Sequence, residues 1–184
     1  MRIVGGRLKG RALKGPASDA IRPTSDRLRE TVFNILAHSH GNPVAGARVI
    51  DLFAGTGAMA IEALSRGAYF ALVVDQSANA CAIIRANFAA LDLGGAARIL
   101  RHDARKLGPA PDGESFSLAF LDPPYGKGLV PPTLKALRDG GWLGKDALAV
   151  IEERGGAEVA LPEGFVLRET RRFGVTQVVL ACCN

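Results

Sequence analysis

The sequence has few aromatic residues and few cysteines, and it has no apolar stretch long enough to cross a membrane. Aromatic residues make up 6% of its 184 residues, against 48% hydrophobic and 22% charged residues. This composition is typical of a folded globular protein and excludes an intrinsically disordered one. The longest apolar stretches, such as 68–74 and 147–151, are far shorter than the roughly 18 to 20 residues that span a bilayer.

The N-terminus also lacks the pattern of a targeting segment. No continuous apolar stretch follows the first charged residue, Arg2, so neither a secretory signal nor a stop-transfer segment is predicted. The chain has the usual length of one domain. We therefore expect a cytoplasmic protein with one domain and no membrane anchor.

The three cysteines, Cys81, Cys182 and Cys183, do not suggest a disulfide framework or a metal site. Their number is odd, and Cys81 is far in sequence from the adjacent pair. Disulfide-rich secreted domains usually have an even number of cysteines, and zinc sites have closely spaced pairs of ligands; the three cysteines here fit neither pattern. We expect three reduced thiols and no metal ion.

Positive charge is unevenly distributed along the chain. The net charge is +5, and residues 1–30 hold eight Lys and Arg against three acids, whereas the remaining residues hold fifteen of each. A basic arm on a neutral body is typical of a protein that contacts a phosphate backbone, although a solvated surface is the alternative interpretation. The residues predicted to contact phosphate, and RNA if the family resemblance described below holds, are Arg2, Arg7, Lys9, Arg11, Lys14, Arg22 and Arg27.

The first forty residues predict a short hairpin followed by a helix. Residues 2–4 and 12–13 flank a glycine-rich stretch and would form the hairpin. After Pro23, Thr24 or Ser25 can cap a helix that runs to about residue 38. We divide the chain into an N-terminal arm, residues 1–24, and a main domain, residues 25–184.

From residue 47 onward, short apolar runs alternate with helical segments. The expected strands are 48–53, 69–74, 97–100, 117–121 and 148–151, and the expected helices are 58–65, 78–91 and 129–137. This alternation predicts an α/β fold with a parallel sheet that is covered by helices on both faces. Two final runs, 165–172 and 175–181, have no helix between them, so they should pair as an antiparallel hairpin.

The first of these strands ends in a nucleotide-binding turn, Asp51-Leu52-Phe53-Ala54-Gly55-Thr56-Gly57. The two glycines allow a sharp turn that approaches a ligand closely, and Asp75 at the end of the next strand can accept hydrogen bonds from ribose hydroxyls. Asp103 follows the third strand and belongs to the same edge of the sheet, although it could also cap a helical turn. These features fit a dehydrogenase about as well as a methyltransferase.

The fourth strand ends in Asp122-Pro123-Pro124-Tyr125. Two prolines stiffen the turn, so that a carboxylate, a carbonyl group and an aromatic ring are fixed together at the carboxyl edge of the sheet. The carboxylate and the Pro123 carbonyl could hold the exocyclic amine of adenine or guanine, and Tyr125 could stack on the extruded base. This motif predicts a catalytic site for amine methylation.

Both motifs resemble those of the S-adenosylmethionine-dependent amino methyltransferases. The N-terminal half resembles more narrowly the bacterial small-subunit ribosomal RNA guanine-N2 methyltransferases, through Arg2-Ile3-x-Gly5-Gly6, Gly10-Arg11-x-Leu13, Arg22-Pro23-Thr24-x-Asp26-Arg27-x-Arg29-Glu30 and Phe33-Asn34. The resemblance covers nearly the whole chain, but no motif is recognised in residues 181–184.

The resemblance implies a Rossmann-like class I methyltransferase with a seven-stranded sheet, S-adenosylmethionine as the methyl donor and no metal. The acceptor would be the N2 amine of one guanine of 16S ribosomal RNA in the small subunit, and we expect a monomer. By the same resemblance, Asp51, Phe53, Ala54, Gly55, Thr56 and Gly57 would hold the methionine part of the donor. Asp75 would hold the ribose and Asp103 the adenine amine.

Three other functions stay open at this point. Another amino methyltransferase could act on DNA adenine, on another RNA site or on a protein glutamine, although the chain has no room for a separate DNA-recognition domain. A dehydrogenase is disfavoured by the 122–125 motif, and a non-catalytic RNA-binding module is disfavoured by the intact acids. His38, His40, His102 and Trp142 are expected to have structural roles.

Overall fold

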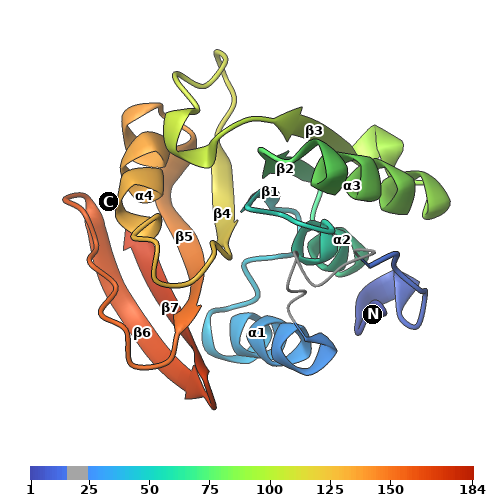
Figure 1. Ribbon diagram of the computed structural model, residues 1–184, viewed down its shortest axis with the longest axis horizontal. Coiled ribbons are helices and arrows are strands. Elements are labelled where there is room, and N and C mark those ends of the chain that lie inside the picture. Colours follow the sequence, from blue (N-terminus) through green and yellow to red (C-terminus); the bar gives the residue numbers. More distant parts are fainter. Residues whose placement is uncertain (16–24) are drawn as a thin grey trace.

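The computed structural model describes residues 1–15 and 25–184. Within these residues a single seven-stranded sheet is flanked by helices on both faces (Figure 1). The strands are β1 (Arg48–Leu52), β2 (Phe70–Asp75), β3 (Ala97–Arg101), β4 (Phe116–Leu121), β5 (Leu143–Arg154), β6 (Phe165–Phe173) and β7 (Thr176–Cys183). The helices are α1 (Asp26–Ser39), α2 (Ala58–Ser65), α3 (Ala78–Ala90) and α4 (Val130–Asp139), with short 3-10 helices η1 (Gly6–Leu8), η2 (Gly94–Ala96) and η3 (Ala104–Lys106).

The order of the strands is β3-β2-β1-β4-β5-β7-β6. Strands β1 to β5 pair in parallel, and β7 pairs antiparallel with both β5 and β6. The predicted parallel sheet with an antiparallel C-terminal hairpin is therefore confirmed. Because β1, β2, β4 and β5 run in the same direction, their carboxyl ends meet at one edge, where open α/β sheets bind their ligands.

The core has one layer on each face of the sheet. Helices α1, α2 and α3 bury residues such as Phe33, Ile61 and Ile84 against one face, and α4 buries Leu134 and others against the opposite face. Each strand contributes alternate residues to the two layers. Both faces are covered, which explains why the central parts of β1, β2, β4 and β5 are largely apolar.

Trp142 has the structural role that the sequence suggests. It is 3% exposed, its Nε1 donates to the Gly108 carbonyl at 2.8 Å, and its ring stacks on Phe116. It anchors the start of β5 in the α4 layer of the core.

Most strand boundaries lie within two residues of the expected ones, and two of the differences have a structural reason. The first strand ends at Leu52, because Phe53 already has a left-handed backbone with φ 59°. The fifth strand was expected at 148–151 but spans Leu143–Arg154. Lys145 and Asp146 interrupt its apolar pattern, and the register against β4 shifts where they lie.

The N-terminal arm packs against the body of the domain through its described part, residues 1–15. The predicted hairpin forms: Arg2 and Ala12 make an antiparallel bridge, the Ile3 N–H donates to the Arg11 carbonyl at 3.0 Å, and the Leu13 N–H donates to the Met1 carbonyl at 3.1 Å. Ile3 and Leu13 are buried in the same core layer as α1 and α2. The arm lies beside α2 (Figure 1), and Gly6 there has φ 72°, with a hypothetical Cβ only 2.0 Å from the carbonyl oxygen of Ser65. A larger residue would push the arm off α2.

A buried ion network joins the arm to α1 and α2. The side chains of Arg29 and Glu62 are both fully buried, with Arg29 Nε 3.4 Å from Glu62 Oε2. The Arg29 guanidinium also contacts the Asp26 carboxylate, at 2.8 Å, and the Arg2 carbonyl oxygen. Glu62 accepts from the Val4 backbone N–H at 2.9 Å and from Arg66 Nε at 2.8 Å.

The network makes the attachment of the arm costly to disturb. Removing one partner of such a buried pair leaves an uncompensated charge and typically costs about 3–5 kcal/mol. The Arg2 and Glu62 contacts hold the backbone of the arm itself, so the family-like motifs around Arg2 and Arg29 have a structural role.

Helix α1 begins where one of the two predicted caps lies. The Ser25 hydroxyl accepts from the Leu28 backbone N–H at 3.1 Å. The alternative cap Thr24, the predicted RNA-binding residue Arg22 and the proposed domain boundary lie outside the described residues. The three cysteines are free thiols, as expected. Among the described helices, none is long and apolar enough to span a bilayer.

Candidate active site

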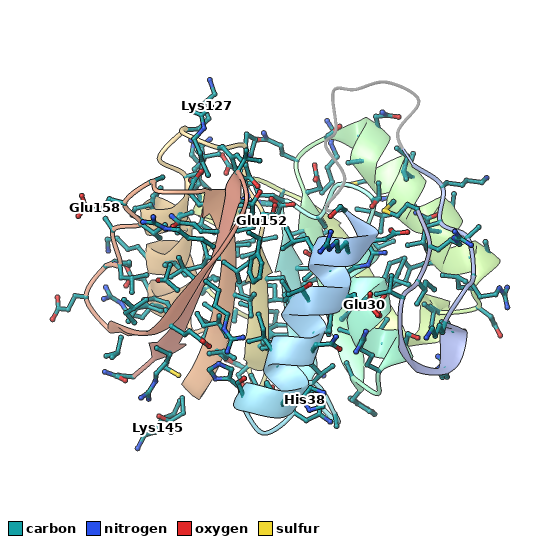
Figure 2. The ribbon with its side chains drawn as sticks, turned by 90° about the horizontal axis from the view of Figure 1, so that it is seen from below. Glu30, His38, Lys127, Lys145, Glu152 and Glu158 are labelled. Carbon is teal, nitrogen blue, oxygen red and sulfur yellow. The ribbon has the colours of Figure 1, made fainter. Side chains whose placement is uncertain are left out.

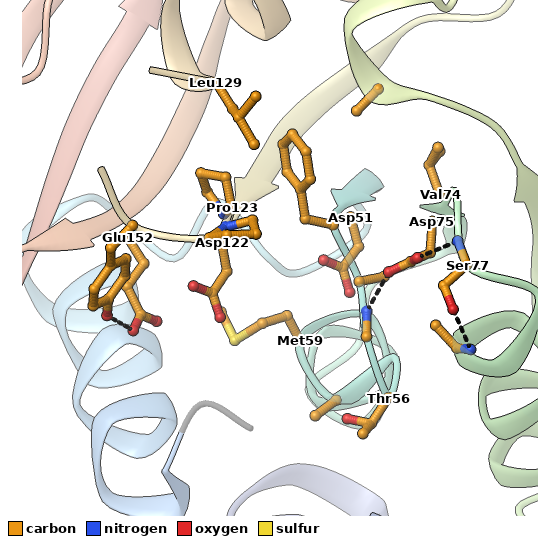
Figure 3. A pocket seen from close by; sticks show the side chains of 18 of the residues that line it. Asp51, Thr56, Met59, Val74, Asp75, Ser77, Asp122, Pro123, Leu129 and Glu152 are labelled. Atoms are coloured by element: carbon orange, nitrogen blue, oxygen red, sulfur yellow. Dashed lines mark hydrogen bonds between the residues drawn. The ribbon is translucent and has the colours of Figure 1, made fainter. Parts of the chain in front are cut away.

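A cleft of about 1320 Å³ opens at the carboxyl edge of the sheet. Its walls come from the ends of β1, β2, β4 and β5, from the first turns of α1 and from the β6–β7 turn (Figure 3). Pockets that hold one small molecule usually have volumes of about 300 to 1,000 Å³. The cleft is therefore large enough for two ligands side by side.

The structure brings most of the predicted site residues into this cleft. The predicted donor-binding and catalytic residues that line it are Asp51, Phe53, Ala54, Gly55, Thr56, Asp75, Asp103, Asp122, Pro123, Pro124 and Tyr125. Gly57 does not line it. Of the predicted RNA-binding residues that the structure describes, Arg27 lines the cleft, whereas Arg2, Arg7, Lys9, Arg11 and Lys14 lie outside it.

Asp51 is the most deeply buried acid of the cleft. It is 2% exposed, and its Oδ2 accepts from the backbone N–H of Ala60 in the first turn of α2, at 3.0 Å. Burial raises the pKa of Asp51 to about 7, and the negative charge of nearby Asp75 adds to this effect, whereas the Ala60 hydrogen bond opposes it. Asp51 therefore titrates near neutral pH.

The turn after β1 is held in an unusual backbone conformation. Phe53, Gly55 and Gly57 all have positive φ, of 59°, 57° and 77°, which is rare for a bulky residue such as Phe53. A Cβ on Gly57 would lie 3.2 Å from the ring of Phe88 in α3. Gly57 thus serves the turn and the packing of α3, and strain of the kind seen at Phe53 is common in functional sites.

Asp75 fixes this turn from the neighbouring strand. Its Oδ2 accepts from the Gly55 backbone N–H at 2.9 Å, and its Oδ1 accepts from the Ser77 backbone N–H at 2.8 Å. The Ser77 hydroxyl in turn caps α3. The carboxylate thus has a fixed orientation at the end of β2.

Asp103 takes part in both arrangements that the sequence allows. It lines the cleft, and it also caps η3 by accepting from the Arg105 backbone N–H. The Arg105 guanidinium binds both of its carboxylate oxygens, at 2.9 and 2.7 Å. This side chain lowers the pKa of Asp103 to about 2, so Asp103 is a carboxylate at neutral pH.

The residues of the 122–125 motif follow β4 directly. The Tyr125 hydroxyl donates to Glu152 Oε1 at 2.6 Å and lies 3.0 Å from Thr176 Oγ1 (Figure 3). Burial raises the pKa of Tyr125 above its usual value, and the hydrogen bond to Glu152 adds to the rise. Tyr125 is therefore a neutral phenol whose ring is fixed by β5 and β7.

The sequence analysis missed Glu152, Thr176 and Lys127, which also line the cleft. Glu152 had a signal, because it follows the apolar run 147–151 as Asp75 and Asp122 follow theirs. Thr176 had no such signal, since only strand pairing brings it near the cleft.

His102 lines the cleft too, and His40 caps the end of α1 and lies 3.0 Å from Glu169. In residues 1–15 and 25–184, no group of three or more His, Cys, Asp and Glu could hold a metal ion.

The family model "Conserved hypothetical protein 95" matches residues 1–182. The chain belongs to this family. The match to Conserved hypothetical protein 95 spans both the N-terminal arm and the sheet with its cleft.

Relatives of this Conserved hypothetical protein 95 member have methyltransferase names. The chain is 39% identical over 152 residues to "Ribosomal RNA small subunit methyltransferase D" of Escherichia coli K12, which covers 83% of this chain and 74% of the relative. It is 36% identical to "Putative rRNA methyltransferase YlbH" of Bacillus subtilis, over 98% and 97% of the two chains.

A solved structure, "Putative methyltransferase yhhF from Escherichia coli", superimposes with a TM-score of 0.84 at 32% identity, over 100% of this chain and 97% of the other. The fold is the Rossmann-like methyltransferase fold that the sequence predicts.

The raised pKa of Asp51 predicts a pH-dependent cost to stability. The pKa in the folded chain, about 7, exceeds the ordinary value of 3.8, so the folded state retains a proton that the unfolded state has lost. Stability therefore falls as the pH rises from about 4 to 7. Asp51→Asn stays neutral and can still accept from Ala60. It should be more stable than the wild type at pH 8, by about 1 to 4 kcal/mol, and the difference should narrow at pH 5.

Urea unfolding of both proteins at pH 8 and pH 5 measures this difference. Asp112→Asn, in an exposed loop, is the matched control and should show no such change. If the free energies of unfolding of Asp51→Asn and the wild type differ by the same amount at both pH values, the raised pKa of Asp51 is contradicted.

Proposed function

We propose that this protein is an S-adenosylmethionine-dependent ribosomal RNA methyltransferase that modifies the N2 amine of a guanine in the 16S RNA of the small subunit. The observation that carries the proposal is the Asp122-Pro123-Pro124-Tyr125 turn, which faces the same cleft as Asp51 and Asp75. The names of the relatives support ribosomal RNA as the substrate.

The chemistry of the cleft fits the methyl donor. S-adenosylmethionine, when bound, supplies a methyl group on a positively charged sulfur. The carboxylates along the edge suit a cation, and Phe53, Val74 and Ala104 give apolar surface for an adenine ring. The turn from Asp51 to Gly57 would hold the methionine part and Asp75 the ribose. Asp103 would bind the adenine amine while it shares its oxygens with Arg105.

The 122–125 motif is suited to the acceptor. The Asp122 carboxylate and the Pro123 carbonyl would accept hydrogen bonds from the two N–H groups of the guanine amine and so orient its nitrogen. Tyr125 would stack on the extruded base, as enzymes that modify bases require. Methyl transfer would give the N2-methylated guanine, the neutral thioether that remains of the donor, and one proton released from the amine. The protein contributes mainly the alignment of the reacting atoms.

The basic residues would bind the RNA outside the cleft. Arg2, Arg7, Lys9, Arg11 and Lys14 are exposed on the described part of the arm. Arg27 lines the cleft itself and would contact the RNA near the extruded base. Because α2 holds the arm, these charges have a fixed position relative to the cleft. A rigid basic surface suits the recognition of folded RNA by its shape.

The first test is transfer of tritium from labelled S-adenosylmethionine to small subunits that lack the modification, followed by nucleoside analysis. The wild type should produce N2-methylguanosine. Asp122→Ala should lower turnover by about two orders of magnitude, because it removes an interaction with the reacting amine. The control Asp112→Ala should retain wild-type turnover.

Two results would contradict the proposal. N6-methyladenosine as the product would indicate an adenine enzyme, and no transfer to any RNA would point to a different substrate. Near-normal turnover of Asp122→Ala would remove this carboxylate from the mechanism.

Removing positive charge from the arm tests whether its basic residues contact RNA phosphates. Deleting the arm would also remove Ile3 and Leu13 from the core, so the informative change is Arg7→Gln with Lys9→Gln, two exposed residues. Each lost phosphate contact should flatten the dependence of log affinity on log salt by about 0.7 to 0.9. Binding of this variant to small subunits across a salt series measures the slope.

Lys145→Gln is the control. Lys145 lies at the end of the molecule opposite Lys127, which lines the cleft (Figure 2). It should leave the salt dependence unchanged. Equal slopes for the wild type and the arm variant would show that the arm is only a solvated surface.

A further inference from the structure

We propose that Glu152 selects guanine over adenine by accepting a hydrogen bond from the N1–H of the extruded base. The proposal rests on the proposed function, since it concerns the same cleft and the same reaction. It assigns a specificity role to a residue that the catalytic motif does not include.

Glu152 and Asp122 share one side of the cleft. Glu152 lies near the carboxyl end of β5, the strand next to β4, and both residues line the cleft. Both also line a small secondary cavity together with Met59 and Val178. Figure 3 shows Glu152 on the same side of the cleft as Asp122 and Pro123. A base held by Asp122 would therefore meet a second carboxylate.

The hydrogen-bonding pattern of this part of the cleft matches guanine. Ionised carboxylates only accept hydrogen bonds, and the Pro123 carbonyl also only accepts. Guanine presents its N1–H directly beside its N2 amine, so one edge of the base offers a continuous row of donors. Adenine has lone pairs at N1 and N7 on both sides of its amine. A second carboxylate beside Asp122 would meet a donor in guanine and a lone pair in adenine.

The contact of Glu152 with Tyr125 is compatible with this role. The Tyr125 hydroxyl donates to Oε1 at 2.6 Å, and a carboxylate can accept about four hydrogen bonds in all. The same contact fixes the direction of the carboxylate relative to the ring that would stack on the base. Glu152 could then position Tyr125 and select the base at the same time.

The test compares guanine with 2-aminopurine, which has the same 2-amino group but a lone pair at N1. The methylated position is first mapped with the wild type, and subunits are then reconstituted with 2-aminopurine at that position. The wild type should methylate 2-aminopurine at least about tenfold more slowly, because the Glu152 carboxylate faces a lone pair. Glu152→Gln introduces an amide N–H that can donate to N1. It should shift the guanine to 2-aminopurine rate ratio at least about tenfold toward 2-aminopurine.

Two further variants separate selection from positioning. Thr176→Val removes a second contact of the Tyr125 hydroxyl without changing Glu152, so it should lower both rates and leave their ratio unchanged. Glu158→Gln, at an exposed residue far from Glu152 (Figure 2), should change neither rate.

An unchanged ratio in folded Glu152→Gln would overturn the inference, and so would equal wild-type rates on the two bases. The latter comparison does not depend on any variant. If the wild type methylates no guanine of the subunit, the proposed function fails before the comparison begins. If the wild type methylates guanine but Glu152→Gln has the same guanine to 2-aminopurine rate ratio as the wild type, only the role of Glu152 fails.

Discussion

Backbone N–H groups hold the carboxylates that the parallel sheet gathers at one edge. Asp51 accepts from Ala60, and Asp75 accepts from Gly55 and Ser77. Without these donors, acids so close together would repel one another and would lose their fixed orientations. The donors belong to the turns and first helical residues that follow β1 and β2. The geometry of the site is therefore established when these βα units fold.

Helix α2 links this edge to the arm. Its first turn contributes the Ala60 N–H, and its last turn contributes Glu62 and Ser65, which bind Val4 and the backbone of Gly5 and Leu8. The helix has only eight residues, so it acts as a short rigid connection. The buried contact of Arg29 with Glu62 adds α1 to the same unit. Basic residues at the N-terminus therefore have a fixed distance from the cleft.

The sequence predicted most of the fold, because the alternation of apolar runs with helices depends on local periodicity. It also placed Asp51, Asp75, Asp103 and Asp122 at one edge, since parallel strands leave little freedom there. The full length of β5 could not be predicted, because Leu143 belongs to it through pairing with β4 and residues 152–154 through pairing with β7. The Tyr125 contacts with Glu152 and Thr176, and the burial of Ile3 and Leu13 in the same core layer as α1 and α2, join residues far apart in sequence that no local pattern connects.

The most direct test of the account is calorimetric titration of the purified protein with S-adenosylmethionine, its demethylated product, NAD and NADP. If the acids along the carboxyl edge form an adenosine site for a sulfonium donor, the protein should bind S-adenosylmethionine and its demethylated product. Neither nicotinamide cofactor should bind. Tight binding of NAD or NADP without binding of the sulfonium compound would contradict it.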